Sequence, residues 1–447
     1  MRWLGDRIRE RGDAPALVWR DEAVSGGELL ERASGCGAEM DGLGVPRGAV
    51  VGLEGDLSPA TCSLLLALID RAAVCVPLAS AAPAERDRFL EIAGAEWVAA
   101  PGGRGWTQRE PFRPPHDLVA RLRADGEAGL VLFTSGSTGE PKAALHAFPR
   151  LLEKFREPRK ALRTLVFLLL DHIGGVNTLF HVLANGGTAV AAERRDPDAV
   201  CAAIAHWGVQ LLPTTPTFLN LLLLSEAHTR HDLSSLEQIT YGTEPMPQAT
   251  LDRLRQVLPG ARLSQTYGLS ELGILRVRSE SSGSLRVQLG GAGVETRVVD
   301  GTLRIRTPSA MLGYLNAASP FDAEGWYDTE DEVLQEDGWC RLLGRRSEII
   351  NVGGQKVYPV EVESVLLTLP NVREAAVVGE PHPLTGQIVA GYLTLRQPEP
   401  TESVRRRLRH HCSALLPSFK VPQRIAVVDG DLHSVRFKKT IPRGSDG

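Results

Sequence analysis

Apolar, strand-like runs alternate with helix signals through the first three quarters of the chain. Several runs, including 130–133 and 188–191, are apolar throughout instead of alternating with polar residues. Such runs are typical of parallel strands that helices cover on both faces. The order of the signals therefore predicts the α/β fold class, with layers of sheet and helix. Further strands are expected at 16–19, 49–53, 73–77, 97–100, 165–170 and 209–212.

Two helix starts support this interpretation. Ser25 and Glu28 have the spacing of a capping box, and we expect the helix to run to about Met40. Ser58 followed by Pro59 indicates a second start, because proline is tolerated at the first helical position.

The pattern changes from about residue 287 onward. Short alternating segments at 296–300 and 301–306 predict a small antiparallel or barrel-like sheet. We therefore predict a large N-terminal domain, 1–345, of layered α/β lobes plus a small β-rich subdomain, and a small, mobile α+β domain, 346–447. The signals in the second domain are a Gly-Gly turn, a helix beginning at Pro359, strands at 375–378 and 388–395, an arginine-rich helix and a strand at 424–428.

Composition excludes some classes of function. The chain has 447 residues and a net charge of −4, so it lacks the basic footprint of general nucleic-acid binding. The sequence contains no apolar stretch long enough to span a bilayer. Its six cysteines form no C-x-x-C pair, which favours reduced thiols. We expect a cytoplasmic protein with no nucleic-acid partner and no membrane association.

A loop of small hydroxyl residues and glycines follows the apolar run 130–132. Residues 133–142 read Phe-Thr-Ser-Gly-Ser-Thr-Gly-Glu-Pro-Lys. Backbone N–H groups, hydroxyls and an ammonium in such a loop can approach a polyphosphate closely. The loop is not a Walker A motif, because its spacing differs and Pro141 stands where a helix would continue. Taken alone, it also fits a surface turn. The candidate phosphate ligands are Thr134, Ser135, Gly136, Ser137, Thr138, Gly139 and Lys142.

A second cluster covers residues 265–271, Gln-Thr-Tyr-Gly-Leu-Ser-Glu. Tyr267 offers a flat face for a base and Gln265 offers an amide for its edge. Gly268 permits a sharp turn, Ser270 adds a hydroxyl, and Glu271 is a hard carboxylate suited to Mg²⁺. Taken alone, the string also fits an ordinary turn.

Two further clusters lie nearer the C-terminus. Asp331 has the chemistry to accept both hydroxyls of a ribose, and Arg345 to reinforce the sugar or a phosphate. Gly353 and Gly354 predict a hairpin whose backbone lines a narrow channel. The basic segment 436–440 supplies a lysine that could reach a reacting phosphate, although a solvated tail is equally consistent with it.

In this order, the clusters resemble the adenylate-forming superfamily of acyl- and aryl-CoA ligases, peptide-synthetase adenylation domains and luciferases. The family pattern [ST]-[ST]-G-[ST]-T-G-x-P-K matches 134–142, and Y-G-x-[ST]-E matches 267–271. The chain is closest in pattern to stand-alone acyl-CoA or acyl-carrier-protein ligases. The resemblance also assigns the motif's downstream histidine to His146, the adenine-contacting segment to Gly242, Thr243 and Glu244, the ribose aspartate to Asp331 and the arginine of the family's G-R to Arg345.

The resemblance implies a two-step reaction with ATP and Mg²⁺ as cofactors. An acid first attacks the α-phosphate of ATP to give an acyl-adenylate and pyrophosphate, and a thiol of CoA or of a carrier protein's phosphopantetheine then displaces AMP. The implied catalytic residues are Lys439, Thr138, Glu271 and His172, with Glu271 as the metal ligand. In the second step the small domain is expected to rotate, which withdraws Lys439 and brings Gly353 and Gly354 to the thiol channel.

The chain departs from the family pattern in four places. Glu330 replaces the glycine before the ribose aspartate, Ala143 replaces the glycine after Pro-Lys, and Ser347 stands at the hinge. The family's S-G-K is here 437–439, Phe-Lys-Lys, so the register favours Lys439 as the catalytic lysine and leaves Lys438 as an alternative.

The identity of the carboxylic acid substrate is the part of the function that the sequence constrains least. In this register His172 falls where amino-acid-activating relatives carry an aspartate, and Asp171 lies one place early. We therefore expect a small acid without an α-amino group, aryl or fatty acyl. The alternatives are an amino-acid adenylation enzyme that loads a carrier protein, a nucleotide-binding pseudoenzyme, and oxidation of the luciferase type. Candidate pocket residues are Asn177, Thr214, Thr215, Tyr241, Thr243, Ile274 and Leu275.

Overall fold

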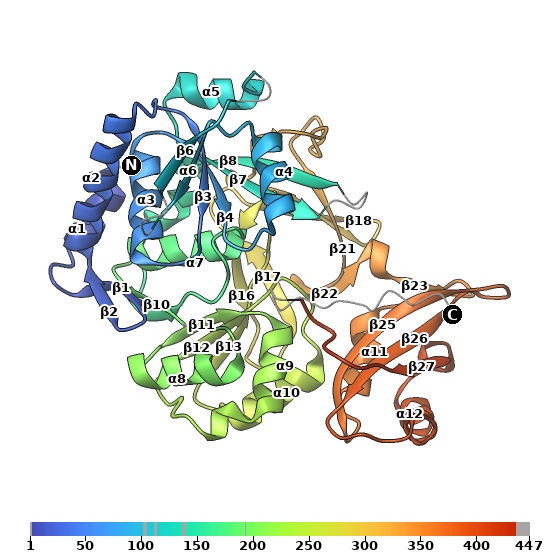
Figure 1. Ribbon diagram of the computed structural model, residues 1–447. Helices are drawn as coiled ribbons and strands as arrows, with labels where there is room; N and C mark the ends of the chain where they lie inside the picture. The colour runs from blue at the N-terminus through green and yellow to red at the C-terminus, as the bar shows by residue number, and fades with distance from the viewer. Residues whose placement is uncertain (1, 102–104, 111–113, 136–139, 193, 435–447) are drawn as a thin grey trace.

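The computed structural model describes residues 2–101, 105–110, 114–135, 140–192 and 194–434. Two mainly parallel seven-stranded sheets with their helices form the larger part of the molecule (Figure 1). The first sheet is parallel except for its last strand. In spatial order its strands are β13 (Arg262–Gln265), β12 (Gln238–Tyr241), β11 (Leu211–Thr214), β9 (Arg163–Leu165), β10 (Thr188–Ala191), β1 (Pro15–Trp19) and β2 (Glu22–Ser25).

The second sheet has a parallel centre and antiparallel edges. Its strands are β20 (Gly313–Tyr314), β8 (Pro141–Ala147), β7 (Gly129–Ser135), β4 (Val74–Leu78), β3 (Val50–Glu54), β5 (Trp97–Ala100) and β6 (Gly105–Gln108).

Helices cover both faces of both sheets, which explains why several of the strands are apolar throughout. In β1, Leu17 packs into a core between the sheets, whereas Val18 packs into a core on the outer face. In β7, Leu130 packs into the same core between the sheets. Val131, on the opposite face of the strand, packs into a core on the outer face of the second sheet. The helices of this part are α1 (Arg2–Arg9), α2 (Gly26–Leu43), α3 (Pro59–Asp70), α4 (Pro83–Ala93), α5 (Asp117–Asp125), α6 (Phe148–Leu152), α7 (Ile173–Ala184), α8 (Pro197–Trp207), α9 (Pro216–Ser225) and α10 (Gln248–Val257).

A six-stranded antiparallel sheet follows the parallel sheets in the chain. A separate pair, β14 (Gly268–Leu269) with β15 (Gly273–Ile274), carries part of the second motif. In spatial order the six strands are β16 (Arg276–Ser279), β17 (Arg286–Gly290), β22 (Trp339–Arg345), β21 (Tyr327–Glu336), β19 (Thr302–Arg306) and β18 (Glu295–Val299).

The C-terminal part has its own sheet and its own apolar core, and it lies beside the rest of the molecule (Figure 1). The predicted fold class is therefore confirmed. The boundary predicted after residue 345 falls between β22 and the short helix η3 (Arg346–Glu348), and it stays a prediction. The elements are β23 (Ile350–Val352), β24 (Gln355–Val357), α11 (Pro359–Leu366), β25 (Val372–His382), β26 (Gly386–Leu395), α12 (Thr401–Leu415) and β27 (Arg424–Val427).

Local sequence signals hold with one exception. Ser25 and Glu28 form the predicted capping box, and Ser58 caps α3. The strand predicted at 165–170 is wrong beyond Leu165, where β9 ends. The chain turns there against α7, and a Cβ added to Gly175 would lie 2.0 Å from the carbonyl oxygen of Leu169. Among the described helices, none is long and apolar enough to cross a membrane.

Candidate active site

The predicted phosphate loop is flanked by two antiparallel strands, β7 and β8. Strand β7 ends at Ser135, β8 begins at Pro141, and Thr134 pairs with Lys142 across the two strands. The chain thus returns as a strand instead of entering a helix, in agreement with the absence of a Walker A pattern. Predicted residues Gly136, Ser137, Thr138 and Gly139 lie outside the described residues.

The two segments predicted to contact the nucleotide, 242–244 and 265–271, lie next to each other at one edge of the first sheet. Thr214, Tyr241 and Gln265 end three adjacent parallel strands and lie in register. The segments 242–244 and 266–268 continue directly from the last two of these strand ends. The carboxyl ends of parallel strands are where α/β sheets bind ligands.

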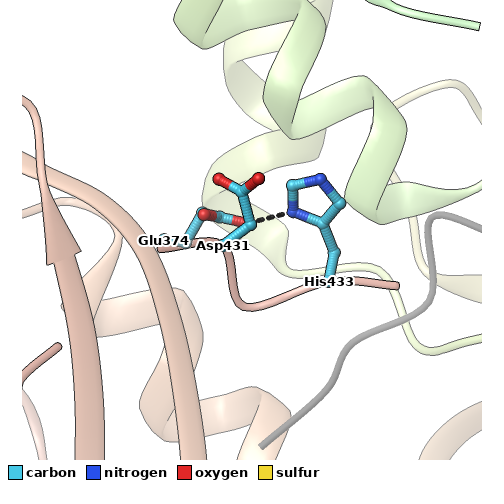
Figure 2. A group of neighbouring side chains, drawn as sticks. All are labelled: Glu374, Asp431 and His433. Atoms are coloured by element: carbon cyan, nitrogen blue, oxygen red, sulfur yellow. Dashed lines mark hydrogen bonds and ion pairs between the residues drawn. The ribbon is translucent and has the colours of Figure 1, made fainter. Parts of the chain in front are cut away.

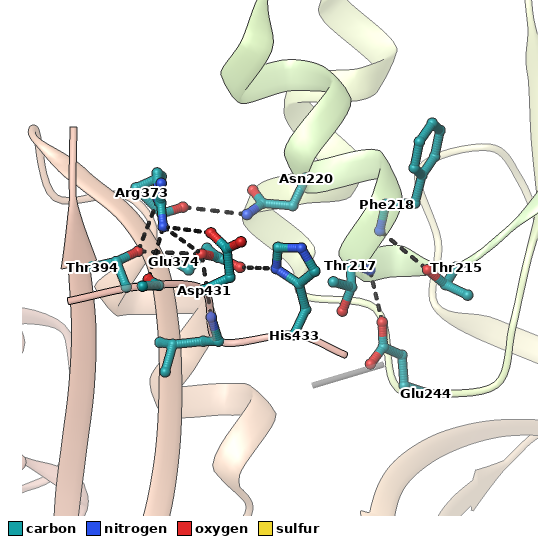
Figure 3. Close-up of polar contacts among 12 residues, drawn as sticks. Thr215, Thr217, Phe218, Asn220, Glu244, Arg373, Glu374, Thr394, Asp431 and His433 are labelled. Atoms are coloured by element: carbon teal, nitrogen blue, oxygen red, sulfur yellow. Dashed lines mark hydrogen bonds and ion pairs between the residues drawn. The ribbon is translucent and has the colours of Figure 1, made fainter. Parts of the chain in front are cut away.

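Close backbone packing explains the glycine at position 242. A Cβ on Gly242 would lie 2.4 Å from Thr266 Oγ1, so no larger residue fits without movement. Thr243 adopts a left-handed φ of 74°, which is uncommon outside glycine. Glu244 accepts a hydrogen bond from the backbone N–H of Thr217 at 2.7 Å (Figure 3). Its carboxylate therefore stabilises the start of α9.

Tyr314 connects Glu271 to Lys142, and the sequence motifs did not include it. Its hydroxyl donates to Glu271 Oε1 at 2.7 Å, and Lys142 Nζ lies 5.5 Å from its ring centroid. Tyr314 and Glu271 are only 7% and 8% exposed. Burial and the neighbouring carboxylate raise the pKa of Tyr314, so it stays a neutral donor.

Two further contacts fix this region. Asn316 Oδ1 accepts from the N–H of Ala143, and its Nδ2 donates to the carbonyl of Pro141. It therefore holds the backbone on both sides of Lys142. His146 Nε2 lies 2.6 Å from the carbonyl oxygen of Ser270, to which it donates. Burial lowers the pKa of His146 to about 4, so the imidazole is neutral and ties β8 to the loop that carries Glu271.

The predicted ribose ligands also come together. Asp331 and Arg345 are cross-strand partners in β21 and β22, with Oδ1 and Nε 3.7 Å apart. The hydroxyl of Tyr267 donates to Asp331 Oδ2 at 2.6 Å. Burial raises the pKa of Asp331, although Tyr267 and Arg345 oppose the shift. Glu330 has a left-handed φ of 59°, which is the physical reason that glycine suits this position.

A cleft of about 1410 Å³ opens beside these strand ends and extends to α7 and β16. His172, Asn177, Thr214, Ile274 and Leu275 are among its lining residues, as are Gly242, Thr243, Gln265 and Gly268. The structure places Thr215 and Tyr241 elsewhere, because both are buried in the fold and Thr215 caps α9. 

At the start of α7, Asp171 and His172 serve local structure. Asp171 Oδ2 accepts from the backbone N–H and the hydroxyl of Ser80, at 3.0 and 2.6 Å. His172 Nδ1 accepts from the N–H of Gly174 and caps the helix.

The C-terminal part docks on the rest through a buried carboxylate. Glu332, on β21, accepts from Lys356 Nζ and from the hydroxyl of Tyr358, both at 2.7 Å. Gly353 and Gly354 form the predicted hairpin turn between β23 and β24, with φ of 59° and 86°.

A second docking contact lies beside the last described residues. His433 Nδ1 donates to Glu374 Oε1 at 2.7 Å (Figure 2). Asn220, on α9, donates to the carbonyl of Arg373 (Figure 3). Glu374, Asp431 and His433 bring ligand atoms within 4.8 Å, but Arg373 already pairs with both carboxylates, so an ion-pair network accounts for the cluster. Lys439 lies outside the described residues.

Comparisons with known proteins agree with this geometry. The model of the AMP-binding enzyme family matches residues 119–315, and that of the AMP-binding enzyme C-terminal domain matches 361–439. A 2-succinylbenzoate–CoA ligase of Bacillus licheniformis is 30% identical over 71% of this chain and 69% of its own length. A 2-succinylbenzoate–CoA ligase of Bacillus pumilus is 27% identical over 96% and 94%.

The fold is also similar to a solved structure. The anthranilate CoA ligase AuaEII in complex with anthranoyl-AMP superposes with a TM-score of 0.84 at 22% identity, over 98% of this chain and 95% of that one.

The chain belongs to the AMP-binding enzymes of the adenylate-forming superfamily. It is an acyl-CoA synthetase-like, AMP-forming ligase, which uses ATP to join a carboxylic acid to a thiol through an acyl-adenylate.

Proposed function

We propose that this enzyme activates an aryl or fatty acid without an α-amino group and transfers the acyl group to CoA. The observation that carries the proposal is the meeting of Lys142 and Glu271 at Tyr314. This arrangement presents a cation for phosphates and a hard carboxylate beside one ring. An anionic acid can approach a triphosphate only where such charges offset the repulsion.

Glu271 fits Mg²⁺ by its donor chemistry, since carboxylate oxygens are the ligands this ion prefers. When bound, the ion would neutralise charge on the phosphates. Tyr314 and the His146–Ser270 contact hold the carboxylate and its loop in place. In this proposal the phosphate loop orients the β- and γ-phosphates through Thr134, Ser135, Gly136, Ser137, Thr138, Gly139 and Lys142.

The nucleoside would lie along the neighbouring strand ends. Asp331, held by Tyr267 and Arg345, has one carboxylate positioned for both ribose hydroxyls. Gly242 and Gly268 keep the backbone free of side chains beside the base. The other proposed nucleotide contacts are Thr243, Glu244, Gln265 and Ser270.

The choice of acid follows from the start of α7. An amino-acid-activating enzyme needs a carboxylate to pair with the substrate ammonium, but Asp171 already binds Ser80. This contact favours an acid without an α-amino group, with His172 in the wall of the cleft. The names of the ligases for 2-succinylbenzoate and anthranilate support an aryl acid.

The second step would require the C-terminal part to move. Rotation about 345–347 breaks the contacts of Glu332 with Lys356 and Tyr358. It would withdraw Lys439 from the adenylate and bring Gly353 and Gly354 to the thiol.

Separate assays of the two steps test the proposal. We expect Lys439→Ala to abolish adenylation and to spare thioester formation from supplied acyl-adenylate, whereas Lys438→Ala should affect both steps little. Mass spectrometry after incubation with CoA or with a phosphopantetheinylated carrier protein should find acyl-CoA. Acylated carrier protein without acyl-CoA would contradict the choice of acceptor.

A further inference from the structure

Lys154 is a half-buried lysine in the wall of the cleft, and the proposed chemistry does not use it. It lies in the short helix η1 (Glu153–Phe155). Its ammonium donates to Asn177 Oδ1 and to the carbonyl oxygen of Ile274, both at 2.6 Å. An ammonium carries three N–H donors, and within the described part of the chain these are its two acceptors.

The two acceptors place the ammonium near the reaction. Ile274 lies opposite Gly268 in the pair β14–β15, so Lys154 is one strand away from the 267–271 motif. Asn177 stands on α7, one turn beyond His172 and on the same cleft. Lys154 therefore faces the part of the cleft between α7 and the strand ends.

The cleft wall carries an excess of positive charge. Six cationic side chains and one carboxylate, Glu280, lie in the lining. Two of the cations, Lys160 and Arg276, already pair with Glu237 and Glu157, which leaves four cations. Burial lowers the pKa of Lys154 to about 7, and the charge of Arg159 contributes. A bound anion would offset both effects, because an opposite charge favours the charged form. The cationic side chains are Lys154, Arg159, Lys160, Arg262, Arg276 and Arg278.

We propose that Lys154 is a specificity residue that binds a second carboxylate of the acid substrate. The inference rests on the proposed function and narrows it to dicarboxylic acids whose second group is remote from the reacting one. Asn177 and Ile274 hold the ammonium, and the third N–H makes a charge-assisted hydrogen bond to the substrate.

Kinetics with matched acids test this role. ATP–pyrophosphate exchange would be measured with benzoate against phthalate, isophthalate and terephthalate, and with hexanoate against adipate. We expect the wild type to prefer a diacid by tenfold or more in kcat/KM in at least one set. Lys154→Met should remove the preference and leave the monoacid rate within about threefold, because the reacting groups are untouched.

Two further variants serve as a control and as a substitute for the methionine variant. Lys420→Met removes a lysine that pairs with Glu361 in the C-terminal part, and it should keep the diacid preference. Lys154→Gln retains an amide donor and serves if the methionine variant does not fold. A wild type without diacid preference, or a lysine variant that keeps it, would overturn the role of Lys154. Absence of exchange with every acid would instead refute the proposed function.

Discussion

Replacing Tyr314 by phenylalanine tests whether this residue positions Glu271. The change removes one hydroxyl and keeps the ring beside Lys142. Both partners of the lost hydrogen bond are more than nine-tenths buried, so water does not replace the donor. A hydrogen bond to a charged group contributes about 1.5–3 kcal/mol.

We therefore expect the free energy of unfolding in urea to fall by about 1.5–3 kcal/mol. If the whole free energy of this hydrogen bond serves to position the Glu271 carboxylate during the reaction, kcat/KM for MgATP in the exchange assay should fall roughly 10- to 150-fold. The half-saturating Mg²⁺ concentration should rise as well.

The control is Tyr392→Phe. Tyr392 donates to Glu380 at the same distance of 2.7 Å, but in the C-terminal sheet. It should leave the kinetics with MgATP unchanged. If Tyr314→Phe loses stability but keeps the wild-type kcat/KM and Mg²⁺ dependence, Tyr314 supports the fold without positioning Glu271.

Three other substitutions probe the site and its surroundings. Gly242→Ala places a Cβ 2.4 Å from Thr266 Oγ1, so we expect a stability loss of about 1–3 kcal/mol and a higher half-saturating ATP concentration; unchanged ATP kinetics would contradict the packing argument. His433→Gln should destabilise more at pH 5.5 than at pH 8.5 in urea unfolding, because the hydrogen bond to Glu374 raises the pKa of His433. The stabilisation from His433 is complete below the pKa of histidine in the unfolded chain, about 6.5, and is lost as pH rises through the raised pKa of the folded protein. An equal loss of stability at pH 5.5 and pH 8.5 would refute this role of His433. Glu330→Gly should raise the free energy of unfolding by about 0.5–1 kcal/mol, because φ is 59° at this position, and a loss would show that the side chain makes a stabilising contact.

Much of the fold could be predicted from local sequence, because both faces of central parallel strands such as β4 and β10 are buried. The runs at 97–100 and 188–191 became strands with those bounds. The strand predicted from the apolar run at 165–170 was wrong beyond Leu165, because an apolar run does not distinguish a strand from a buried turn. Its residues fill the space at the end of the sheet, where Gly175 brings α7 against them.

The site was predictable where its residues are neighbours in sequence, as in 134–142 and 265–271. Tyr314 could not be found this way, because it joins the site only when β20 pairs with β8, far away in the chain. The same holds for Glu332, which meets Lys356 and Tyr358 only after the C-terminal part docks. These contacts depend on tertiary pairing, which no local pattern encodes.

Acid-dependent exchange between ATP and labelled pyrophosphate tests the central claim most directly, since it reports reversible acyl-adenylate formation without any thiol. The wild type should exchange label above the acid-free background with at least one aryl or fatty acid. Glu271→Gln, shown by circular dichroism to be folded, should lose about a hundredfold or more of this rate. Exchange that is independent of added acid, or that survives in Glu271→Gln, would contradict the account.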